Sequence, residues 1–313
     1  MIYSKIIGTG SHLPEKVLTN FDLEKLLDTS DEWITSRSGI KKRHIVETET
    51  TCDLAEVASR NALDMAGINA NELDLIILAT STPDKIFPST ASLLQKKLGS
   101  NCPVFDVQAV CAGFVYAITT ANQYIKNGEA NKVLVVGSET FSRIMNWKDR
   151  STAVLFGDGA GAALLTSSNE KGIIYNKLCA NSKHLSSLQT NNDIINSKGF
   201  IEMNGSDVFK IAVSELSKLA QTSLKDCNMS VEDLDWFIPH QANIRIISAI
   251  AKKIGLPMDK VIKTVDKHGN TSAASVPLAL DEAIRDNRIK KNDLCLLEAI
   301  GGGFTWGSVL FYL

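Results

Sequence analysis

Cys111 is the residue of this sequence with the clearest potential for nucleophilic chemistry. It lies in DVQAVCAGFVYAI, residues 106–118, where a hydrophobic strand is expected to end and an apolar helix to begin. The free N–H groups and the positive dipole end at a helix N-terminus favour a thiolate, the nucleophilic form of cysteine. A free cysteine is also a common small apolar core residue. The local sequence fits both interpretations.

Three other segments place polar or flexible residues after expected strands. His240 follows LDWFIP, Asn270 lies in VIKTVDKHGNTSAAS, and Gly301, Gly302 and Gly303 follow LCLLEAI. Histidine polarises a carbonyl group or transfers a proton near neutral pH. Asparagine is a neutral hydrogen-bond donor, and glycine lets backbone N–H groups approach a substrate oxygen. With Cys111 these residues predict a nucleophilic site, although each one alone also fits a structural role.

The elements that would position these residues recur along the chain. ELDLIILAT (72–80) and KVLVVGSE (132–139) are expected strands that follow helical patterns, as in a parallel sheet covered by helices. Similar segments return as LKDCNMSVEDLDWFIPH (224–240) and KKNDLCLLEAIGGG (290–303), both displaced by 161 residues. Chance similarity between ordinary α/β units is the alternative to a duplication.

We predict an α/β fold with two duplicated halves, residues 1–170 and 171–313, joined at the polar segment SSNEKG (167–172). One covering helix is expected at 51–68, with Thr51 or Asp53 as its cap and its end at Gly67. Ligands bind beyond the carboxyl ends of parallel strands, so two packed halves would direct these ends to one cleft.

Composition favours a cytoplasmic globular protein. The formal net charge of −2 argues against a nucleic-acid partner, and no apolar run or N-terminal leader predicts a membrane span or secretion. The cysteines have neither the spacing of a zinc site nor the context of disulfides, so we expect reduced thiols and no metal. They are Cys52, Cys102, Cys111, Cys179, Cys227 and Cys295.

Over essentially its whole length, the sequence resembles β-ketoacyl-acyl-carrier-protein synthase III, a condensing enzyme of the thiolase superfamily. This resemblance implies a thiolase-like α-β-α-β-α layered architecture. Its motifs are TSDEWITSRSGIKKRH (29–44), DVQAVCAGF (106–114), DRSTAVLFGDGAGAALL (149–165), PHQANIRIISAIAKK (239–253), KHGNTSAAS (267–275) and EAIGGGFTWGS (298–308).

The resemblance implies that Cys111, His240 and Asn270 are catalytic. Cys111 would accept a short acyl group, expected to be acetyl, from acyl-CoA. Malonyl acyl carrier protein would then lose carbon dioxide, and its enolate would attack the acyl-cysteine to start fatty acid synthesis. The backbone N–H groups of Cys111 and Gly303 are the implied oxyanion donors, and no cofactor beyond the CoA thioester is implied. A related condensing acyltransferase with a non-fatty-acid product, and a noncatalytic binding scaffold, are the alternatives.

The same resemblance assigns binding residues. Trp33 and Arg150 would sandwich the CoA adenine, Arg37 would meet phosphate, and Gly205 and Asn243 would line the pantetheine tunnel.

The resemblance implies a basic patch that contacts the acidic carrier protein, whereas without it ordinary solvated surface charges are the preferred explanation; the residues are Lys210, Arg245, Lys252 and Lys253. Phe141 and Phe87 would border the acyl pocket and favour acetyl or propionyl primers, with Phe87 contributed from the partner subunit of a homodimer. Gln108 and Val110 are departures from the usual family motif and are expected to alter packing beside Cys111.

Overall fold

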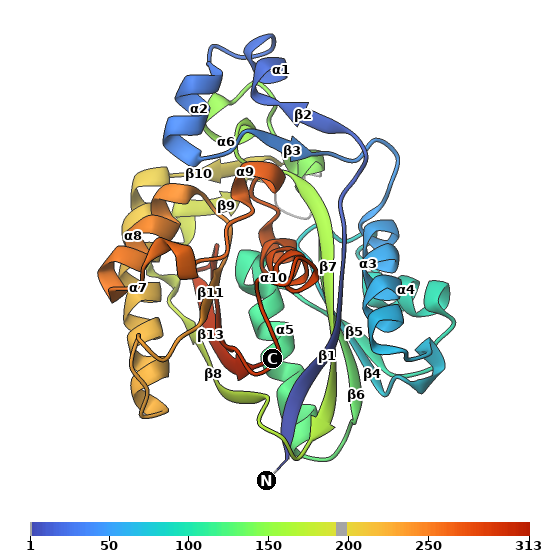
Figure 1. Cartoon of the computed structure of the whole chain (residues 1–313). Coiled ribbons are helices and arrows are strands. Elements are labelled where there is room, and N and C mark those ends of the chain that lie inside the picture. The colour runs from blue at the N-terminus through green and yellow to red at the C-terminus, as the bar shows by residue number, and fades with distance from the viewer. Residues whose placement is uncertain (1, 192–198) are drawn as a thin grey trace.

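The computed structural model describes residues 2–191 and 199–313. Two β-sheets form its frame (Figure 1). The first has the order β1 (Tyr3–His12), β7 (Asp158–Ser168), β6 (Lys132–Thr140), β4 (Leu75–Ala79) and β5 (Val104–Val107). The second has the order β11 (Trp236–Pro239), β12 (Leu294–Gly301), β13 (Thr305–Tyr312) and β8 (Ile173–Ala180).

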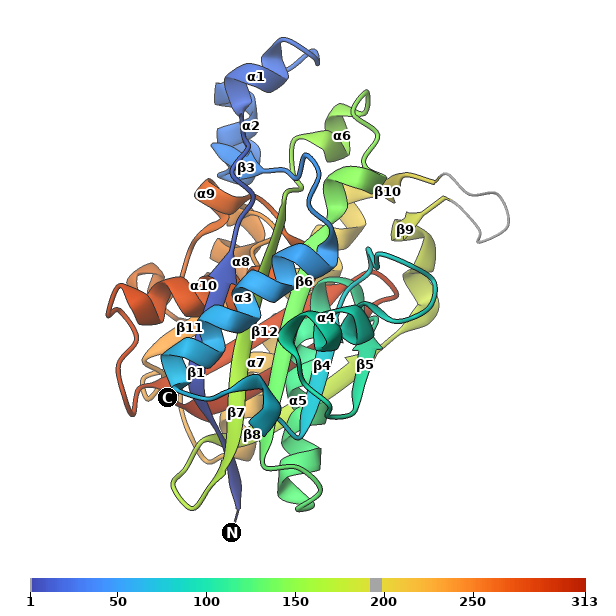
Figure 2. The ribbon, with the colours of Figure 1, turned by 90° about the vertical axis from the view of Figure 1, so that its right-hand side faces the viewer.

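Helices cover both sheets and fill the space between them, as Figures 1 and 2 show. The outer face of the first sheet carries α3 (Thr51–Ala66) and α4 (Thr90–Leu98), and the outer face of the second carries α7 (Gly205–Asp226) and α8 (Ile244–Ile254). Between the sheets lie α5 (Gly113–Lys126) and α10 (Ser275–Arg285). The predicted layered thiolase-like α/β architecture is confirmed.

Side-chain alternation along the buried strands builds these layers. In β4, Ile76 and Leu78 pack with α3 and α4, whereas Ile77 and Ala79 face the central helices. Successive residues of a strand point to opposite faces, so a strand covered on both sides must be apolar throughout. This explains why LIILA contains no polar residue.

The two sheets repeat one strand order. Strands β1, β7, β6 and β4 correspond in sequence to β8, β13, β12 and β11, and in both sheets the third and fourth strands of that order are parallel. Within the described residues the second sheet has no named strand at the place of β5. A single parallel bridge between Phe237 and Val261 occupies that place. The domain boundary at residues 170 and 171 stays a prediction.

The helix expected at 51–68 ends at Gly67, as predicted, but its cap is Thr50. The Thr50 hydroxyl accepts from the Asp53 N–H, and the Asp53 carboxylate accepts from the Thr50 N–H, which forms a capping box.

A group of short elements lies at one end of the two sheets (Figure 1). They are β2 (Val17–Thr19), α1 (Asn20–Glu24), α2 (Asp31–Ser38), β3 (Lys42–His44), α6 (Arg150–Ala153), β9 (Leu188–Thr190), β10 (Ile201–Met203) and α9 (Val265–His268). In the described part of the chain, no helix has both the length and the apolar character needed to cross a membrane.

Candidate active site

Cys111 lies in a short 3₁₀ turn, η2 (Val110–Ala112), between β5 and α5. The preceding residue, Val110, has a φ of +48°, an uncommon value for a β-branched residue that turns the chain sharply. Cys111 is 4% exposed. Burial raises the pKa of its thiol to about 12. The resting nucleophile is therefore a thiol, and attack requires a proton acceptor.

His240 follows β11 directly, and its N–H donates to the Glu298 carbonyl at 2.7 Å. Its Nδ1 lies 2.5 Å from the Ser275 hydroxyl. The Gln241 N–H also donates to that hydroxyl. We assign the hydroxyl proton to the hydrogen bond with Nδ1, which places the imidazole proton on Nε2. Burial lowers the pKa of His240 to about 3, which keeps the ring neutral.

Asn270 is held through its backbone and its side-chain oxygen. Its N–H donates to the Leu155 carbonyl at 2.9 Å, and its carbonyl accepts from the Gly157 N–H at 3.0 Å. Its Oδ1 accepts from the Ser272 N–H at 2.9 Å. Because the oxygen is used in this way, the side-chain NH₂ group remains available as a donor.

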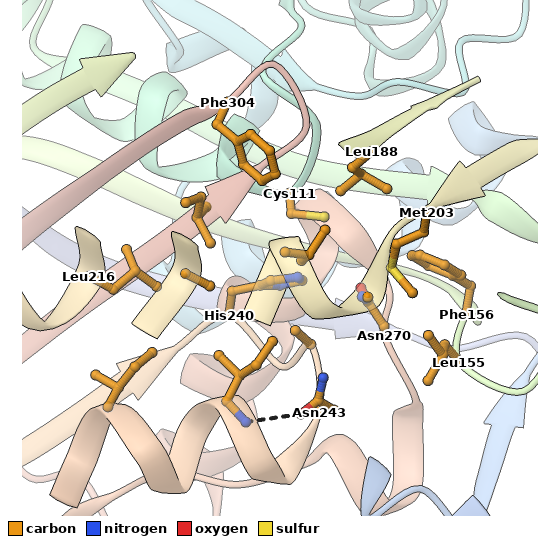
Figure 3. Close-up of a pocket in the computed structure, with 17 residues that line it drawn as sticks. Cys111, Leu155, Phe156, Leu188, Met203, Leu216, His240, Asn243, Asn270 and Phe304 are labelled. Carbon is orange, nitrogen blue, oxygen red and sulfur yellow. Dashed lines mark hydrogen bonds between the residues drawn. The ribbon is translucent and has the colours of Figure 1, made fainter. Parts of the chain in front are cut away.

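These three side chains line one apolar cavity, which we call the active-site cavity. Figure 3 shows Cys111, His240 and Asn270 around a shared space, with Phe304, Leu188, Met203 and Phe156 at its margin. The remaining residues of the cavity are Leu155, Gly205, Val208, Ala212, Leu216, Ala242, Asn243, Ile246, Ile250 and Ile300. Residues from both halves of the chain thus meet at one site, with polar groups few and convergent.

The glycine run packs closely against the nucleophile turn. A Cβ on Gly301 would lie 2.7 Å from the Cys111 amide nitrogen and 2.7 Å from the Ala109 carbonyl oxygen. Only glycine therefore fits without displacement. Gly303 has a φ of +132°, and its N–H has no acceptor among the described residues. The Cys111 and Gly303 amides were the predicted oxyanion donors.

The active-site cavity adjoins a cationic groove, which we call the entrance groove. Both are lined by Gly205 and Asn243. The other residues of the groove are Arg37, Ser206, Phe209, Lys210 and Arg245. The Arg245 guanidinium lies 5.8 Å from the centre of the Phe209 ring. Lys252 and Lys253 are exposed near the end of α8 and do not line this groove.

Trp33 and Arg150 lie side by side. The Arg150 guanidinium carbon is 4.8 Å from the Trp33 ring centre, and its Nη1 donates to the Asp28 carbonyl at 2.7 Å. An aromatic ring between two stacked groups needs about 7 Å, twice the usual carbon contact distance. The predicted sandwich is therefore closed here, and an adenine could enter only after the pair separates.

Phe141 and Phe87 occupy different environments. Phe141 is buried and lines a second cavity, which we name the acyl cavity after the acyl pocket predicted at Phe141; its other residues are Ser81, Gln108, Val110, Ile144, Leu188, Gln189, Thr190, Ile201 and Gly302. Leu188 borders both cavities, so the acyl cavity adjoins the active-site cavity. Phe87 is 83% exposed on the loop before α4 and lines no part of the acyl cavity of its own chain.

Comparisons with known proteins show the family to which the chain belongs. A family model described as 3-oxoacyl-[acyl-carrier-protein (ACP)] synthase III matches residues 105–182, and a model of its C terminal matches residues 224–313. A protein named beta-ketoacyl-[acyl-carrier-protein] synthase III from Vesicomyosocius okutanii is 63% identical over 98% of both chains. One of the same name from Neisseria meningitidis is 56% identical over 99% of both. The chain belongs to the β-ketoacyl-acyl-carrier-protein synthase III family.

Solved structures support the same conclusion. The 3-oxoacyl-[acyl-carrier-protein] synthase III of Aquifex aeolicus has a TM-score of 0.96 and 48% identity, covering 99% of this chain and 100% of that one. As a member of the synthase III family, the chain is a condensing acyltransferase, as its sequence predicted. Among the described residues, no group of three or more His, Cys, Asp or Glu side chains could hold a metal ion.

Sequence reasoning missed the residues that hold the synthase site in place. Gln241 donates to the Pro239 and Ile262 carbonyls and accepts from the Thr264 N–H, so it joins the His240 loop to the segment before Asn270. Ser272, which holds the Asn270 oxygen, and Ser275, which contacts His240, were missed as well, although both lie within the KHGNTSAAS motif. Their hydroxyl-bearing side chains, close to Asn270 in sequence, were the signal that could have revealed them.

Proposed function

We propose that this synthase transfers a short acyl group from acyl-CoA to Cys111 and condenses it with malonyl acyl carrier protein. The observation that carries the proposal is the convergence of the Cys111 thiol, the His240 imidazole and the Asn270 amide on one apolar cavity. The first step forms a thioester at the Cys111 sulfur and releases CoA. The second step forms a carbon–carbon bond and releases carbon dioxide and the Cys111 thiol.

Decarboxylation of the malonyl group needs donors for the developing enolate oxygen. The His240 Nε2–H and the Asn270 NH₂ are suited to this, because Ser275 and Ser272 occupy the other polar atom of each side chain. A neutral His240 fits this role, because its Nε2–H can donate a hydrogen bond to the enolate oxygen without a charge on the ring. The amides of Cys111 and Gly303 would stabilise the tetrahedral oxyanion of the condensation.

The substrates would enter through the entrance groove. Arg37, which lines the groove, would meet the CoA phosphates. Gly205 and Asn243 would border the pantetheine arm, because they line both the groove and the active-site cavity. Lys210 and Arg245 would contact the acidic carrier protein, with Lys252 and Lys253 further along α8. Trp33 and Arg150 would open to receive adenine. No cofactor other than the CoA thioester takes part in this proposal.

A homodimer would complete the acyl cavity. Strand β5 is the last strand of its sheet within the described residues and packs against α4, and the loop before α4 carries Ile86 and Phe87, each 83% exposed. An unpaired strand edge beside exposed apolar side chains favours a second copy as its partner. Phe87 of one copy would then border the acyl cavity of the other, with Phe141 on the opposite side, and favour small primers.

Intact-protein mass spectrometry tests the proposed function. Incubation with acetyl-CoA should add one acetyl group at Cys111, and addition of malonyl carrier protein should remove it with formation of a β-ketoacyl carrier protein. A series of acyl-CoAs should show acetyl or propionyl transfer faster than octanoyl transfer. A Cys111→Ala variant is the control, and an unmodified wild-type protein would refute the proposal.

The Asn270→Ala variant separates the two steps. It should still accept acetyl at Cys111 but lose about 10² to 10³ in the rate of malonyl decarboxylation, the usual effect of removing one oxyanion donor. Equal decarboxylation by the variant and the parent protein would contradict the role given to Asn270.

A further inference from the structure

Glu139 is a fully buried acid near the end of β6 and has no role in the steps above. Its Oε2 accepts from the Thr80 hydroxyl at 3.1 Å, the Thr82 hydroxyl at 2.5 Å and the Ser81 N–H at 3.0 Å. Its Oε1 shares the Ser81 N–H at 3.2 Å and accepts from the Ser272 hydroxyl at 3.1 Å. Every partner donates, so these surroundings suit a carboxylate rather than a protonated acid.

The two threonine hydroxyls anchor one oxygen of the Glu139 carboxylate. The Thr82 N–H donates to the Thr80 hydroxyl at 3.1 Å, and the Thr140 N–H donates to the Thr82 hydroxyl at 2.9 Å. Each hydroxyl therefore accepts from the backbone and directs its own proton to Oε2. With Oε2 anchored to the segment after β4, Oε1 is held as the acceptor of the Ser272 hydroxyl.

The 3₁₀ turn that begins with Ser272, η6 (Ser272–Ala274), packs directly on β6. The β6 side chains that face the core between the sheets alternate along the strand, which places Gly137 and Glu139 on this face. A Cβ at Gly137 would lie 2.4 Å from the Ala273 carbonyl oxygen, so only glycine lets the turn approach this closely. Two residues further along the strand, Glu139 binds the first residue of the turn.

Ser272 links this carboxylate to the active site. Its N–H donates to Asn270 Oδ1 at 2.9 Å, the bond that leaves the Asn270 NH₂ group free to donate into the active-site cavity. The φ of Ser272 is +49°, which is uncommon for a residue other than glycine and persists only where the surroundings enforce it. Glu139 supplies such a restraint, because hydrogen bonds with one ionised partner are roughly twice as strong as neutral ones.

We propose that Glu139 is a positioning residue for malonyl decarboxylation, which holds Ser272 in place and thereby orients the Asn270 amide toward the enolate oxygen. This inference rests on the proposed function and assigns Glu139 no contact with substrate. Two buried hydrogen bonds in series carry it, from the Ser272 hydroxyl to Oε1 of Glu139 and from the Ser272 N–H to Oδ1 of Asn270. A donor lowers the barrier only when it points at the developing charge, so loss of the restraint should slow decarboxylation without weakening substrate binding.

Ser272→Ala and Thr80→Val are a matched pair for testing the proposal. Each removes one hydroxyl donor from the Glu139 carboxylate, but only Ser272 leads on to Asn270. Carbon dioxide release from malonyl carrier protein is measured in the full chain with Cys111→Ala, at about pH 8 because burial raises the pKa of Glu139 to about 7. Ser272→Ala should lower kcat about tenfold at unchanged KM, and Thr80→Val should lower it less than about twofold. Equal effects of the two variants would refute the proposal.

A double variant tests whether Ser272 acts through Asn270. Asn270→Ala alone should lower decarboxylation by about 10² to 10³. If Ser272 serves to orient that amide, adding Ser272→Ala to Asn270→Ala should lower the rate no further, because both changes act on one donor. A loss of the same factor in both backgrounds would show a general structural role for Ser272 and would overturn the inference.

Ser272→Gly separates backbone restraint from the filling of space. This variant also lacks the hydroxyl, but glycine adopts a φ of +49° without strain and keeps the N–H that holds Asn270. It should therefore retain more decarboxylation activity than Ser272→Ala. If Ser272 only filled space, the order would be reversed, since glycine leaves the larger void.

Glu139→Gln tests the carboxylate itself. The amide keeps the size of the side chain, but its NH₂ group meets only donors, so part of the network is lost. Decarboxylation should fall about tenfold, whereas acetyl transfer to Cys111 in the parent background should fall less than about threefold, because Asn270 takes no part in that transfer. Parallel losses in both reactions would refute a positioning role.

The outcomes separate this inference from the proposed function. If Asn270→Ala decarboxylates malonyl carrier protein at the parent rate, the proposed role of Asn270 fails, and the inference fails with it. If Asn270→Ala is slow but Ser272→Ala and Thr80→Val behave alike, only the role of Glu139 is refuted. Should Glu139→Gln fail to fold in a thermal melt, the Ser272 and Thr80 variants, which leave the carboxylate in place, give the decision.

Discussion

The hydrogen bond between Ser275 and His240 gives a prediction with a defined size. Replacing Ser275 with alanine removes the hydroxyl that lies 2.5 Å from Nδ1, and with it the group that keeps the ring proton on Nε2. A neutral hydrogen bond contributes about 0.5–1.5 kcal/mol, which corresponds to about 2- to 13-fold in rate. If the substitution also removes the Nε2–H donor, the decarboxylation rate should fall by about 10². We expect decarboxylation to fall at least tenfold.

The assay is release of carbon dioxide from malonyl carrier protein in a Cys111→Ala background, which isolates the His240 and Asn270 step. Ser223→Ala is the matched control. Ser223 is also buried, and its hydroxyl is hydrogen-bonded to the Ser308 hydroxyl at 2.8 Å, but it lies on α7 and does not line the active-site cavity. It should change the rate less than twofold at similar thermal stability. Equal rates for Ser275→Ala and Ser223→Ala would refute the tautomer argument.

Three further predictions follow from the buried groups. Gly301→Ala places a Cβ 2.7 Å from the Cys111 amide nitrogen, so we expect a loss of about 1–3 kcal/mol in unfolding free energy and a slower condensation, measured by denaturation and product formation. Because the pKa of His240 is about 3, decarboxylation should be independent of His240 ionisation between pH 5 and 8, and a step near pH 6.5 would contradict this. Burial raises the pKa of Glu298 well above 4.5. Above that pH the Glu298 carboxyl keeps its proton in the folded protein but releases it in the unfolded chain, so the wild type loses stability as the pH rises. Glu298→Gln should therefore match the wild type at pH 4 and become the more stable protein toward pH 8.

The regular signals of the sequence were sufficient to predict two similar α/β halves, whereas the layered thiolase-like architecture was implied by the family resemblance. The buried stretches 75–79 and 133–136 are apolar runs, and the same order of runs returns in the second half. Alternating helices and strands with this repetition leave few topologies. The cap of α3 was predicted at Thr51 or Asp53 and lies at Thr50, because only backbone geometry decides among these neighbouring polar residues.

The electrostatics of the site could not be predicted in the same way. A helix start suggested a stabilised thiolate at Cys111, but η2 places the sulfur in a cavity whose burial raises its pKa to about 12. Burial depends on side chains from both halves, and no local segment contains that information. Likewise, the contact between Trp33 and Arg150 is a choice of rotamers that the motif does not encode.

The two halves also use one repeated structural element for two different roles in the active site. Val110 and Ser272 each begin a 3₁₀ turn before a central helix, with φ values of +48° and +49°. The two turns are thus the same strained element in each half, and they pack against each other. In the first half the turn presents Cys111, and in the second its first residue donates its N–H to the Asn270 side-chain oxygen. Strain of this kind persists where the surrounding structure enforces it, so the same element supplies the attacking sulfur in one half and holds the Asn270 amide in the other.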